Sequence, residues 1–236
     1  MDERFLRTAY LLGEENIEKL NNSSVIIFGV GGVGSYTCEA LARAGIGKIT
    51  LVDGDKVSVS NINRQLIALQ STVGQSKVDV MKKRIEDINP NAEVEALNIF
   101  YTKDNESAID FTKYDYVVDA IDTVSSKLLI IEKCYEKNIP IISSMGTGNK
   151  LCPEKLTITD ISKTTTCPLA RVMRRELRNR NIKKLKVCCS AEEPIELKAN
   201  VFDEDTKKQI PGSISFVPPV AGLMIAGEVI KDIINP

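Results

Sequence analysis

The sequence predicts an α/β fold built on a doubly wound, mostly parallel sheet, and three observations support this. Short β-branched apolar runs alternate with segments of helical periodicity over the first 145 residues. Strands separated by helices form right-handed βαβ units, and such units build parallel sheets. A glycine-rich turn follows the first of these runs. The 236 residues suffice for one such domain with a modest extension.

The expected strands and helices alternate along the first half of the chain. The first apolar run ends in glycines, the second ends at Asp53, and the second helix stops at Asn89-Pro90. Glycine and proline are the usual boundaries of such elements. Strands are expected at Val25–Phe28, Lys48–Val52, Val94–Leu97, Tyr116–Asp119 and Pro140–Ser143, and helices at Ser35–Ala44, Lys77–Ile88 and Ser125–Glu136.

The pattern changes after Met145, and we place a soft boundary near Gly148. Residues 1–148 are expected to form a core, and residues 149–236 a C-terminal α/β extension that packs on the same domain. The extension should contain a solvated strand at Leu156–Ile161, a basic helix at Leu169–Arg180, a polar and mobile loop at 192–211, and an apolar strand or turn with a final helix over Phe216–Ile234.

The composition excludes several kinds of chemistry. The chain has no histidine, which removes the Ser-His-Asp arrangement and most zinc sites. Its six cysteines form no Cys-x-x-Cys pair and no signal peptide is evident, so we expect reduced thiols and a cytoplasmic location. The late apolar stretch at 214–234 is a poor membrane span because it is broken by Pro218-Pro219 and carries Glu228 and Lys231.

Charge is distributed unevenly, although the formal net charge is only -1. Between Arg171 and Lys186 there are eight basic residues and one acid, Glu176. A local excess of this kind indicates a segment that faces a polyanion.

The glycine turn between the first strand and helix predicts a nucleotide site. Gly29, Gly31 and Gly34 have the spacing of a dinucleotide-binding loop, in which backbone amides approach phosphates at a helix N-terminus. Asp53 follows Gly34 by nineteen residues and ends the second strand, where an acid can bind ribose hydroxyls. The alternative is a βα turn without a ligand, and this loop alone would make NAD the default nucleotide.

The residues after Asp53 favour a triphosphate over NAD. Asn61, Arg64, Gln65 and Lys77 follow the second strand, and Arg and Lys neutralise the charge that develops on departing pyrophosphate. Each cation taken singly could be a solvated surface charge. Their joint placement after a phosphate loop favours the functional interpretation.

At this point the sequence resembles a known family, the ubiquitin-activating-enzyme-like superfamily, which includes bacterial activators of thiamine and molybdopterin sulfur carriers. The resemblance covers about residues 4–145. Its motifs are Gly29 to Gly34, the Asp53/Asp55 pair, Ser60-Asn61-Ile62-Asn63-Arg64-Gln65, Gly74-Gln75-Ser76-Lys77 and Asp119-Ala120-Ile121-Asp122.

The resemblance implies an ATP-binding, adenylating core of the Rossmann-like type and a role for each motif residue. Gly32 would lie against the phosphates, Asp53 would hold the ribose, and Asp122 would hold Mg²⁺ near the α-phosphate. Arg7 looks like the arginine that reaches the nucleotide of a partner subunit, which implies a homodimer. The implied catalytic residues are Arg7, Arg64, Lys77 and Asp122, and the implied ATP site comprises Gly29, Gly31, Gly32, Gly34, Asp53, Asp55, Asn61, Asn63, Arg64, Gln65 and Lys77.

Adenylation is chemically consistent with these residues. A carboxylate is a poor electrophile until attack on the α-phosphate gives it a good leaving group. The step moves negative charge onto pyrophosphate, so fixed cations and Mg²⁺ stabilise it without proton transfer. The absence of histidine is therefore no obstacle. For Asp122, the alternative is a helix N-cap, with Thr123 and Ser125 nearby.

The second half of the chain favours one branch of the superfamily. Sulfur-carrier activators commonly hold a structural zinc with two Cys-x-x-Cys pairs, which this chain lacks, so no zinc is expected. Other segments resemble tRNA threonylcarbamoyladenosine dehydratases: 142–150, 160–164, 168–177 and 212–222. This resemblance implies ATP-dependent cyclisation of threonylcarbamoyladenosine in tRNA through an acyl adenylate.

The basic helix fits a tRNA partner. Its arginines share a broad face, which could bind phosphates without sequence specificity; they are Arg171, Arg174, Arg175 and Arg178, and Lys183, Lys184 and Lys186 could extend the patch. From charge alone, a solvated face is the favoured interpretation. A covalent cysteine is not supported, and Cys188 or Cys189 would be the least improbable choice.

Two other functions stay open from the sequence. One is an adenylating activator of a ubiquitin-like sulfur carrier, with sulfur-relay proteins as partners. The other is an NAD-dependent oxidoreductase, which the glycine turn alone would suggest. The missing zinc cysteines count against the first, and Arg64 with Lys77 count against the second.

Overall fold

The computed structural model describes residues 2–199, 202 and 209–235. One mixed sheet runs through them in the order β3-β2-β1-β4-β5-β7-β6, and β6 is antiparallel to β7 while the other neighbouring strands pair in parallel. The strands are β1 (Ser24–Phe28), β2 (Lys48–Val52), β3 (Glu93–Leu97), β4 (Tyr116–Asp119), β5 (Ile141–Ser144), β6 (Leu156–Asp160) and β7 (Lys186–Ser190). The expected mostly parallel α/β fold is confirmed.

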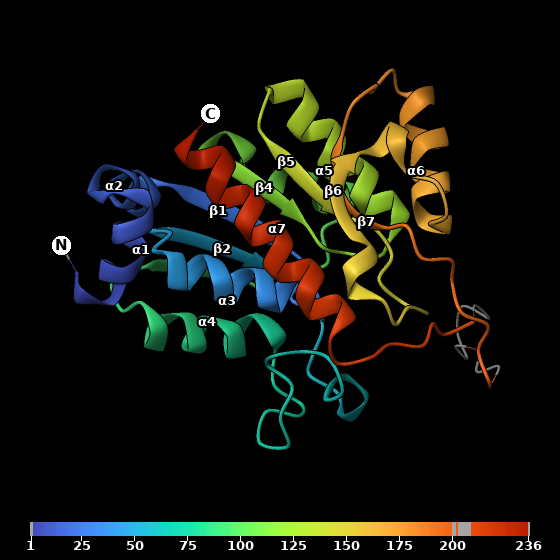
Figure 1. The fold of residues 1–236 in the computed structure, drawn as a ribbon, viewed down its shortest axis with the longest axis horizontal. Coiled ribbons are helices and arrows are strands. Elements are labelled where there is room, and N and C mark those ends of the chain that lie inside the picture. The colour runs from blue at the N-terminus through green and yellow to red at the C-terminus, as the bar shows by residue number, and fades with distance from the viewer. Residues whose placement is uncertain (1, 200–201, 203–208, 236) are drawn as a thin grey trace.

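Helices cover both faces of this sheet (Figure 1). The α-helices are α1 (Leu6–Leu12), α2 (Glu14–Asn22), α3 (Gly34–Ala44), α4 (Lys77–Ile88), α5 (Val124–Lys137), α6 (Pro168–Asn179) and α7 (Val217–Ile234). Short 3-10 turns are η1 (Glu3–Phe5), η2 (Val59–Asn61), η3 (Lys103–Ala108), η4 (Phe111–Lys113), η5 (Pro153–Lys155) and η6 (Ile161–Lys163). None of the described helices combines the length and apolar character needed to cross a bilayer.

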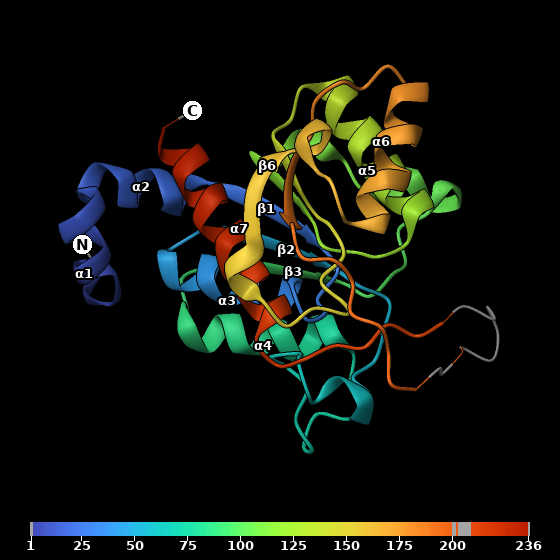
Figure 2. The same cartoon turned by 45° about the vertical axis from the view of Figure 1, so that its right-hand side comes forward.

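The side chains of β1 point alternately to the two faces of the sheet. Val25 and Ile27 belong to the core that β1 shares with α3, α4 and α7, whereas Ile26 and Phe28 belong to the core shared with α5. Successive side chains of a strand point to opposite faces, so a central strand that is covered on both sides is apolar throughout. α6 packs beside α5 through a third apolar cluster that includes Met173. In Figures 1 and 2, α7 crosses the same face as α3.

The side of the sheet on which new strands are added changes between β1 and β4. After β1, the chain adds β2 and β3 on one side, and it then returns to add β4 and β5 on the other side. In open parallel sheets of this kind, ligands bind outside the carboxyl ends of the strands at this point. The fold therefore locates the site before any side chain is considered.

The structure corrects two details of the sequence interpretation. Over 216–234, a strand or turn before the last helix was expected, but α7 is continuous from Val217. Pro218 and Pro219 lie in its first turn, where a missing N–H costs no intrahelical bond. α1 and α2, separated by Gly13 at φ 85°, were not predicted. The mobility expected for 192–211 falls partly on residues outside the described part of the chain.

A close approach between α3 and α7 joins the C-terminal extension to the core. Gly222 of α7 lies so near α3 that an added Cβ would overlap the carbonyl oxygen of Val33 and lie 3.0 Å from Cβ of Tyr36. Thr37 Oγ1 donates a hydrogen bond of 3.1 Å to the carbonyl oxygen of Gly222. The two helices therefore pack backbone against backbone at this point.

We expect Gly222→Ala to lower the free energy of unfolding by about 1–3 kcal/mol, because overpacking must push the two helices apart. Gly227→Ala is the matched control on the same helix, since nothing lies within 4 Å of an added Cβ there. That control should be neutral or should stabilise by up to about 1 kcal/mol through helix propensity. Urea unfolding of both variants measures the difference, and equal midpoints would contradict the close packing.

Candidate active site

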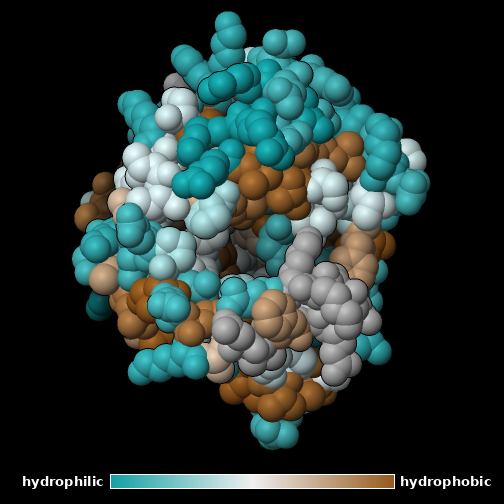
Figure 3. All heavy atoms as spheres, turned by 90° about the vertical axis from the view of Figure 1, so that its right-hand side faces the viewer, coloured by the Kyte–Doolittle hydropathy of each residue, from teal (hydrophilic) through white to brown (hydrophobic). Residues whose placement is uncertain are grey.

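A cavity of about 790 Å³ opens at the carboxyl ends of the central strands. Its walls come from the segments that follow β1, β2, β4 and β5, together with parts of the C-terminal extension. Figure 3 looks into the hollow and shows hydrophilic side chains gathered on the upper part of the same face. The cavity therefore lies where the reversal of strand order predicts it.

The glycine turn forms the floor of the cavity. Gly29 has φ 89°, and an added Cβ would lie 2.8 Å from the carbonyl oxygen of Ala120. Gly34 does not line the cavity; its missing Cβ leaves room for the carbonyl oxygen of Gly29 within the turn. α3 starts at Gly34 without a side-chain cap, which leaves backbone N–H groups available to an anion.

Asp53, which directly follows β2, binds the glycine turn through a hydrogen bond. Its Oδ2 accepts a hydrogen bond of 2.7 Å from the N–H of Val30, and its Oδ1 accepts one of 2.8 Å from the N–H of Asp55. Lys77, at the start of α4, places Nζ 2.7 Å from Asp55 Oδ2 and 4.0 Å from Asp53 Oδ2. The expected ribose acid and phosphate lysine are thus adjacent, with the ammonium held by carboxylates.

Arg64 lines the same side of the cavity, and its guanidinium meets neutral oxygens. Nη1 donates to the carbonyl oxygen of Ser60 at 3.0 Å and to Asn63 Oδ1 at 2.9 Å. No carboxylate ion pair to Arg64 occurs among residues 2–199, 202 and 209–235. Its charge is therefore open to a bound anion.

The neighbouring polar residues have different places. Asn63 does not line the cavity; its Nδ2 donates to the carbonyl oxygen of Ser213 at 3.0 Å and so joins the core to the extension. Asn61 lines the cavity while its Oδ1 accepts from the N–H of Ser58 at 3.1 Å. Gln65 also lines it, is buried, and has an Oε1 with no hydrogen-bond partner.

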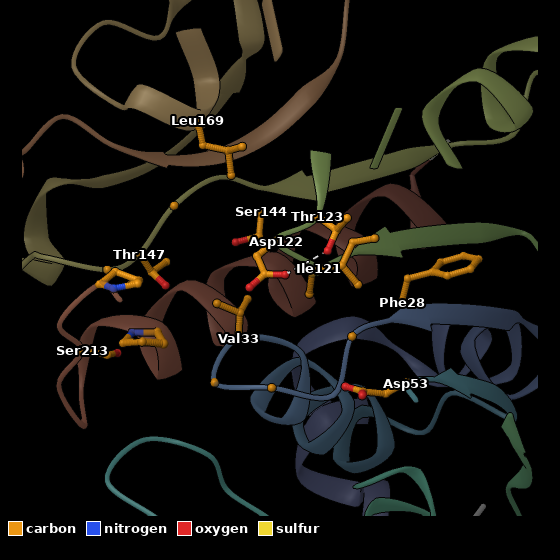
Figure 4. A pocket seen from close by; sticks show the side chains of 18 of the residues that line it. Phe28, Val33, Asp53, Ile121, Asp122, Thr123, Ser144, Thr147, Leu169 and Ser213 are labelled. Carbon is orange, nitrogen blue, oxygen red and sulfur yellow. Dashed lines mark hydrogen bonds between the residues drawn. The ribbon is translucent and has the colours of Figure 1, made fainter. Parts of the chain in front are cut away.

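Asp122 projects from the segment between β4 and α5 into the centre of the cavity. Figure 4 shows it near Ser144 and Val33, with Leu169 on the far side and Asp53 beyond the glycine turn. Its exposed carboxylate receives a long hydrogen bond of 3.4 Å from Thr123 Oγ1. The N-cap of α5 is Thr123 rather than Asp122, so the capping alternative for Asp122 is wrong.

An apolar wall beside Asp53 was missed by the sequence analysis. Phe28, Val52, Ile99 and Phe100 line the cavity there. The ring of Phe100 is 63% exposed and lies over Gly54, where an added Cβ would be 2.7 Å from it. A flat apolar surface of this kind suits a planar base. The run Ile99-Phe100-Tyr101 directly after the third strand was the available signal.

The segment after β5 and parts of the C-terminal extension supply the opposite part of the cavity. Met145 to Lys150, the start of α6 and Pro211 to Ser213 line it. Cys167, the N-cap residue of α6, lies there beside Cys189. The neighbouring Cys189 thiol and the backbone N–H groups around Cys167 lower the pKa of the Cys167 thiol, although burial acts in the opposite direction. Burial raises the pKa of Cys188 to about 12.

The basic side chains of α6 and of the segment after it differ in their exposure and their contacts. Arg171, Arg175 and Arg178 are exposed, but Arg174 is tied to the carbonyl oxygen of Thr164 at 2.8 Å and to its hydroxyl. Lys186 is paired with Glu228 and Asp232, whereas Lys183 and Lys184 are exposed. Arg174 and Lys186 therefore do not belong to a free basic surface.

Arg7 is exposed on α1 and does not line the cavity of its own chain. Tyr10 and Leu11 on the same short helix are 78% and 86% exposed. No cluster of three or more acidic or cysteine side chains that could hold a metal ion occurs among the described residues. The predicted residues are thus brought together at the cavity, with the exceptions of Arg7, Gly34, Asn63 and the α6 arginines.

The chain is similar over most of its length to known proteins. A tRNA threonylcarbamoyladenosine dehydratase of Bacillus subtilis is 47% identical over an alignment of 244 residues, which covers 100% of this chain and 96% of that protein. The Escherichia coli dehydratase is 42% identical over 177 residues, covering 75% and 66% of the two chains. The crystal structure of the E. coli enzyme in complex with AMP superimposes with a TM-score of 0.89 at 34% identity, covering 98% and 94%.

More distant structures share the fold alone. The E. coli protein MccB superimposes with a TM-score of 0.69 at 20% identity. The ThiF family matches residues 4–236, which is almost the whole sequence. The chain that carries this cavity therefore belongs to the ThiF family.

Proposed function

We propose that this protein is an ATP-dependent tRNA threonylcarbamoyladenosine dehydratase, which adenylates the threonyl carboxylate and closes a ring with loss of water. The observation that carries the proposal is the continuity of the cavity. A phosphate-binding turn forms one side of it, and segments of the C-terminal extension form the other. The full-length similarity to named dehydratases supports the same substrate, because it extends over that extension.

ATP fits the first side of the cavity. The base would lie on the apolar wall at Phe100, and the ribose hydroxyls would reach Asp53. The phosphates would meet the amides of the glycine turn and the cations Arg64 and Lys77. Lys77 is held by Asp55 at 2.7 Å, so the phosphates compete for its ammonium. The E. coli relative has been crystallised with ATP and with AMP, which supports the choice of nucleotide.

The reaction then needs two displacements. A carboxylate oxygen of the threonyl group attacks the α-phosphorus, and the bond to pyrophosphate breaks. A nucleophile of the same side chain next attacks the acyl carbon, and AMP leaves with the former carboxylate oxygen. The product is lighter by one water, and ATP becomes AMP and pyrophosphate. Ring closure is fast because the two groups are tethered.

Mg²⁺ fits Asp122. The structure offers one exposed carboxylate in the cavity with a single long hydrogen bond, and Mg²⁺ is commonly held by one or two carboxylates plus substrate phosphates. The ion would neutralise charge on the triphosphate. The carboxylate of Asp122 would hold and orient it beside the glycine turn, and the arginine and lysine would hold the other end of the phosphate chain.

A homodimer is part of the proposal. Arg7 lies outside the cavity of its own chain, next to the exposed apolar side chains of Tyr10 and Leu11. Apolar side chains of that size favour burial against another surface. We propose that α1 docks on a second copy, where Arg7 reaches the nucleotide of the partner subunit. We also propose a cytoplasmic location, where a tRNA substrate is present.

The sulfur-carrier alternative is less well supported. The adenylyltransferase and sulfurtransferase MOCS3 of Culex quinquefasciatus is 36% identical, but over 132 residues, or 56% of this chain. Such similarity reports the shared adenylating core and leaves the extension unexplained. The NAD alternative lacks support because Arg64 and Lys77 bring positive charge to the cavity.

The test is turnover with defined substrates. Purified protein, ATP, Mg²⁺ and tRNA carrying threonylcarbamoyladenosine should yield AMP and a nucleoside lighter by one water, detected by mass spectrometry. The same tRNA without the threonylcarbamoyl group is the control and should give no AMP. A ubiquitin-like carrier ending in Gly-Gly tests the alternative. Pyrophosphate exchange into ATP that depends on that carrier, together with neither AMP nor product from the tRNA, would overturn the proposal.

We expect Asp122→Ala to reduce turnover by at least about 100-fold while the fold is retained, since the side chain is exposed and orients charge at the reacting phosphate. Asp87→Ala, which removes an exposed acid outside the cavity, is the matched control. Thermal unfolding checks the fold, and AMP release measures the rate. Turnover of Asp122→Ala at the control's level would remove the role of this carboxylate.

We expect the triple variant Arg171→Ala, Arg175→Ala, Arg178→Ala to bind tRNA more weakly and with a smaller salt dependence. Each lost phosphate contact should lower the slope of log K against log salt by about one unit. The control replaces Lys82, Lys83 and Lys113 by alanine, which makes the same charge change outside the cavity. If both variants show the wild-type slope, α6 is a solvated face.

A further inference from the structure

A fully buried ion pair lies just behind the cavity. Lys127 of α5 and Asp119 at the end of β4 are each 0% exposed, and Lys127 Nζ lies 2.8 Å from Asp119 Oδ2. Neither side chain lines the cavity. They therefore cannot touch a bound nucleotide or substrate directly, and any effect on the reaction must pass through other residues.

The ammonium of Lys127 uses all three of its donors. Besides Asp119, it donates to the carbonyl oxygen of Ile121 at 3.1 Å and to that of Ser144 at 2.9 Å. The two carbonyl groups belong to different strand ends, one after β4 and one at the end of β5. A single side chain thus bridges two backbone segments that leave neighbouring strands.

Asp119 completes the bridge from the other side. Its Oδ2 also accepts from the hydroxyl of Ser143 at 2.5 Å, and its Oδ1 accepts from the N–H of Ile121 at 3.3 Å. Both carboxylate oxygens are therefore occupied. The ion pair and its four neutral contacts form one satisfied network at the carboxyl ends of β4 and β5.

The bridge begins where the sheet ends. The last paired residues of β4 and β5 are Asp119 and Ser143, so no ladder bond fixes the spacing of the two chains beyond them. Beyond these residues, the segment after β4 carries Asp122, and the segment that begins at the end of β5 forms the Ser144 to Lys150 wall of the cavity. Figure 4 shows Asp122 and Ser144 close together in the centre of the cavity. Lys127 is the contact that spans this gap.

The free-energy cost of burying two charges indicates that this ion pair does more than stabilise the fold. Removing two charges from water is expensive, and an apolar pair of the same volume often stabilises a protein as well or better. What an apolar pair cannot do is hold two carbonyl oxygens and a carboxylate at fixed directions from one atom. The network therefore supplies geometry that packing alone would not.

We propose that Lys127 is a positioning residue for adenylation, which fixes Asp122 on the nucleotide side of the cavity relative to the Ser144 to Lys150 wall on the substrate side. It rests on the proposed function, because these two sides hold the phosphates and the acyl group. A small change in their spacing separates the attacking oxygen from the α-phosphorus, and displacement rates depend steeply on that separation.

The experiment uses variants of the full-length protein. Lys127→Met alone would strand the buried carboxylate, so it is combined with Asp119→Asn, which leaves no buried charge and nearly the same shapes. Lys127→Arg keeps the charge but changes the donor directions. Lys133→Met is the matched control, because it removes a lysine of the same helix that pairs with Glu106 at 3.1 Å outside the cavity.

Two readouts separate positioning from stability. The first is ATP affinity by calorimetry together with kcat for AMP release with threonylcarbamoylated tRNA. In the double variant and in Lys127→Arg, we expect an ATP Kd within about threefold of wild type and a kcat at least about tenfold lower. The second is hydrogen exchange of segments 120–124 and 144–148, which should accelerate, while segment 29–36 and the Lys133→Met protein stay as in wild type.

Each outcome decides something. A folded variant with wild-type kcat and unchanged exchange overturns the positioning role. Failure of both variants to fold also overturns it, because the pair would then serve the fold alone. Wild-type protein without activity on the tRNA refutes the proposed function instead, and hydrogen exchange still tests the bridge in that case.

Discussion

The close approach of the turn after β1 to the segment after β4 is the constraint on which the rest of the structure depends. Gly29 lies against the carbonyl group of Ala120, and Gly34 leaves room for the carbonyl oxygen of Gly29. A side chain at Gly29 would force the two strand ends apart, and one at Gly34 would disrupt the turn itself. The turn can therefore place backbone N–H groups at the start of α3 within reach of Asp122 across the same cavity.

The C-terminal extension is joined to this core at several independent points. α7 packs on α3 at Gly222, and β7 adds directly to β5, so the sheet is shared. Pro218 lies 3.1 Å from the place where a Cβ of Gly32 would be, and Asn63 binds the carbonyl oxygen of Ser213. The part of the chain that is proposed to receive tRNA is consequently fixed against the part that is proposed to bind ATP.

Charge in the site is arranged so that cations are held but not all neutralised. Lys77 is paired with Asp55, whereas Arg64 contacts neutral oxygens. Lys127 is fully paired and lies behind the cavity wall. Among the described cations that line the cavity, Arg64 is available to a polyanion, Lys77 can exchange partners, and Lys150 is buried and donates to the carbonyl oxygen of Glu192 at 2.6 Å. This arrangement leaves Arg64 available to phosphates, while Lys77 and Lys150 each keep a hydrogen-bond partner in the protein.

The parallel core, the glycine turn and most of the polar residues that line the first side of the cavity could be predicted from the sequence, because strand periodicity, glycine spacing and the order of polar residues are local properties. The sequence could not show α1 and α2, the exposed ring of Phe100 over Gly54, the tie from Arg174 to Thr164, or the bridge made by Lys127. The last three depend on contacts between different segments of the chain, and α1 and α2 are short helices of seven and nine residues. Only the tertiary structure decided which charges face the cavity and which are consumed in holding it, since a lysine or arginine looks the same in sequence whether its partner is solvent, a carbonyl oxygen or a buried carboxylate.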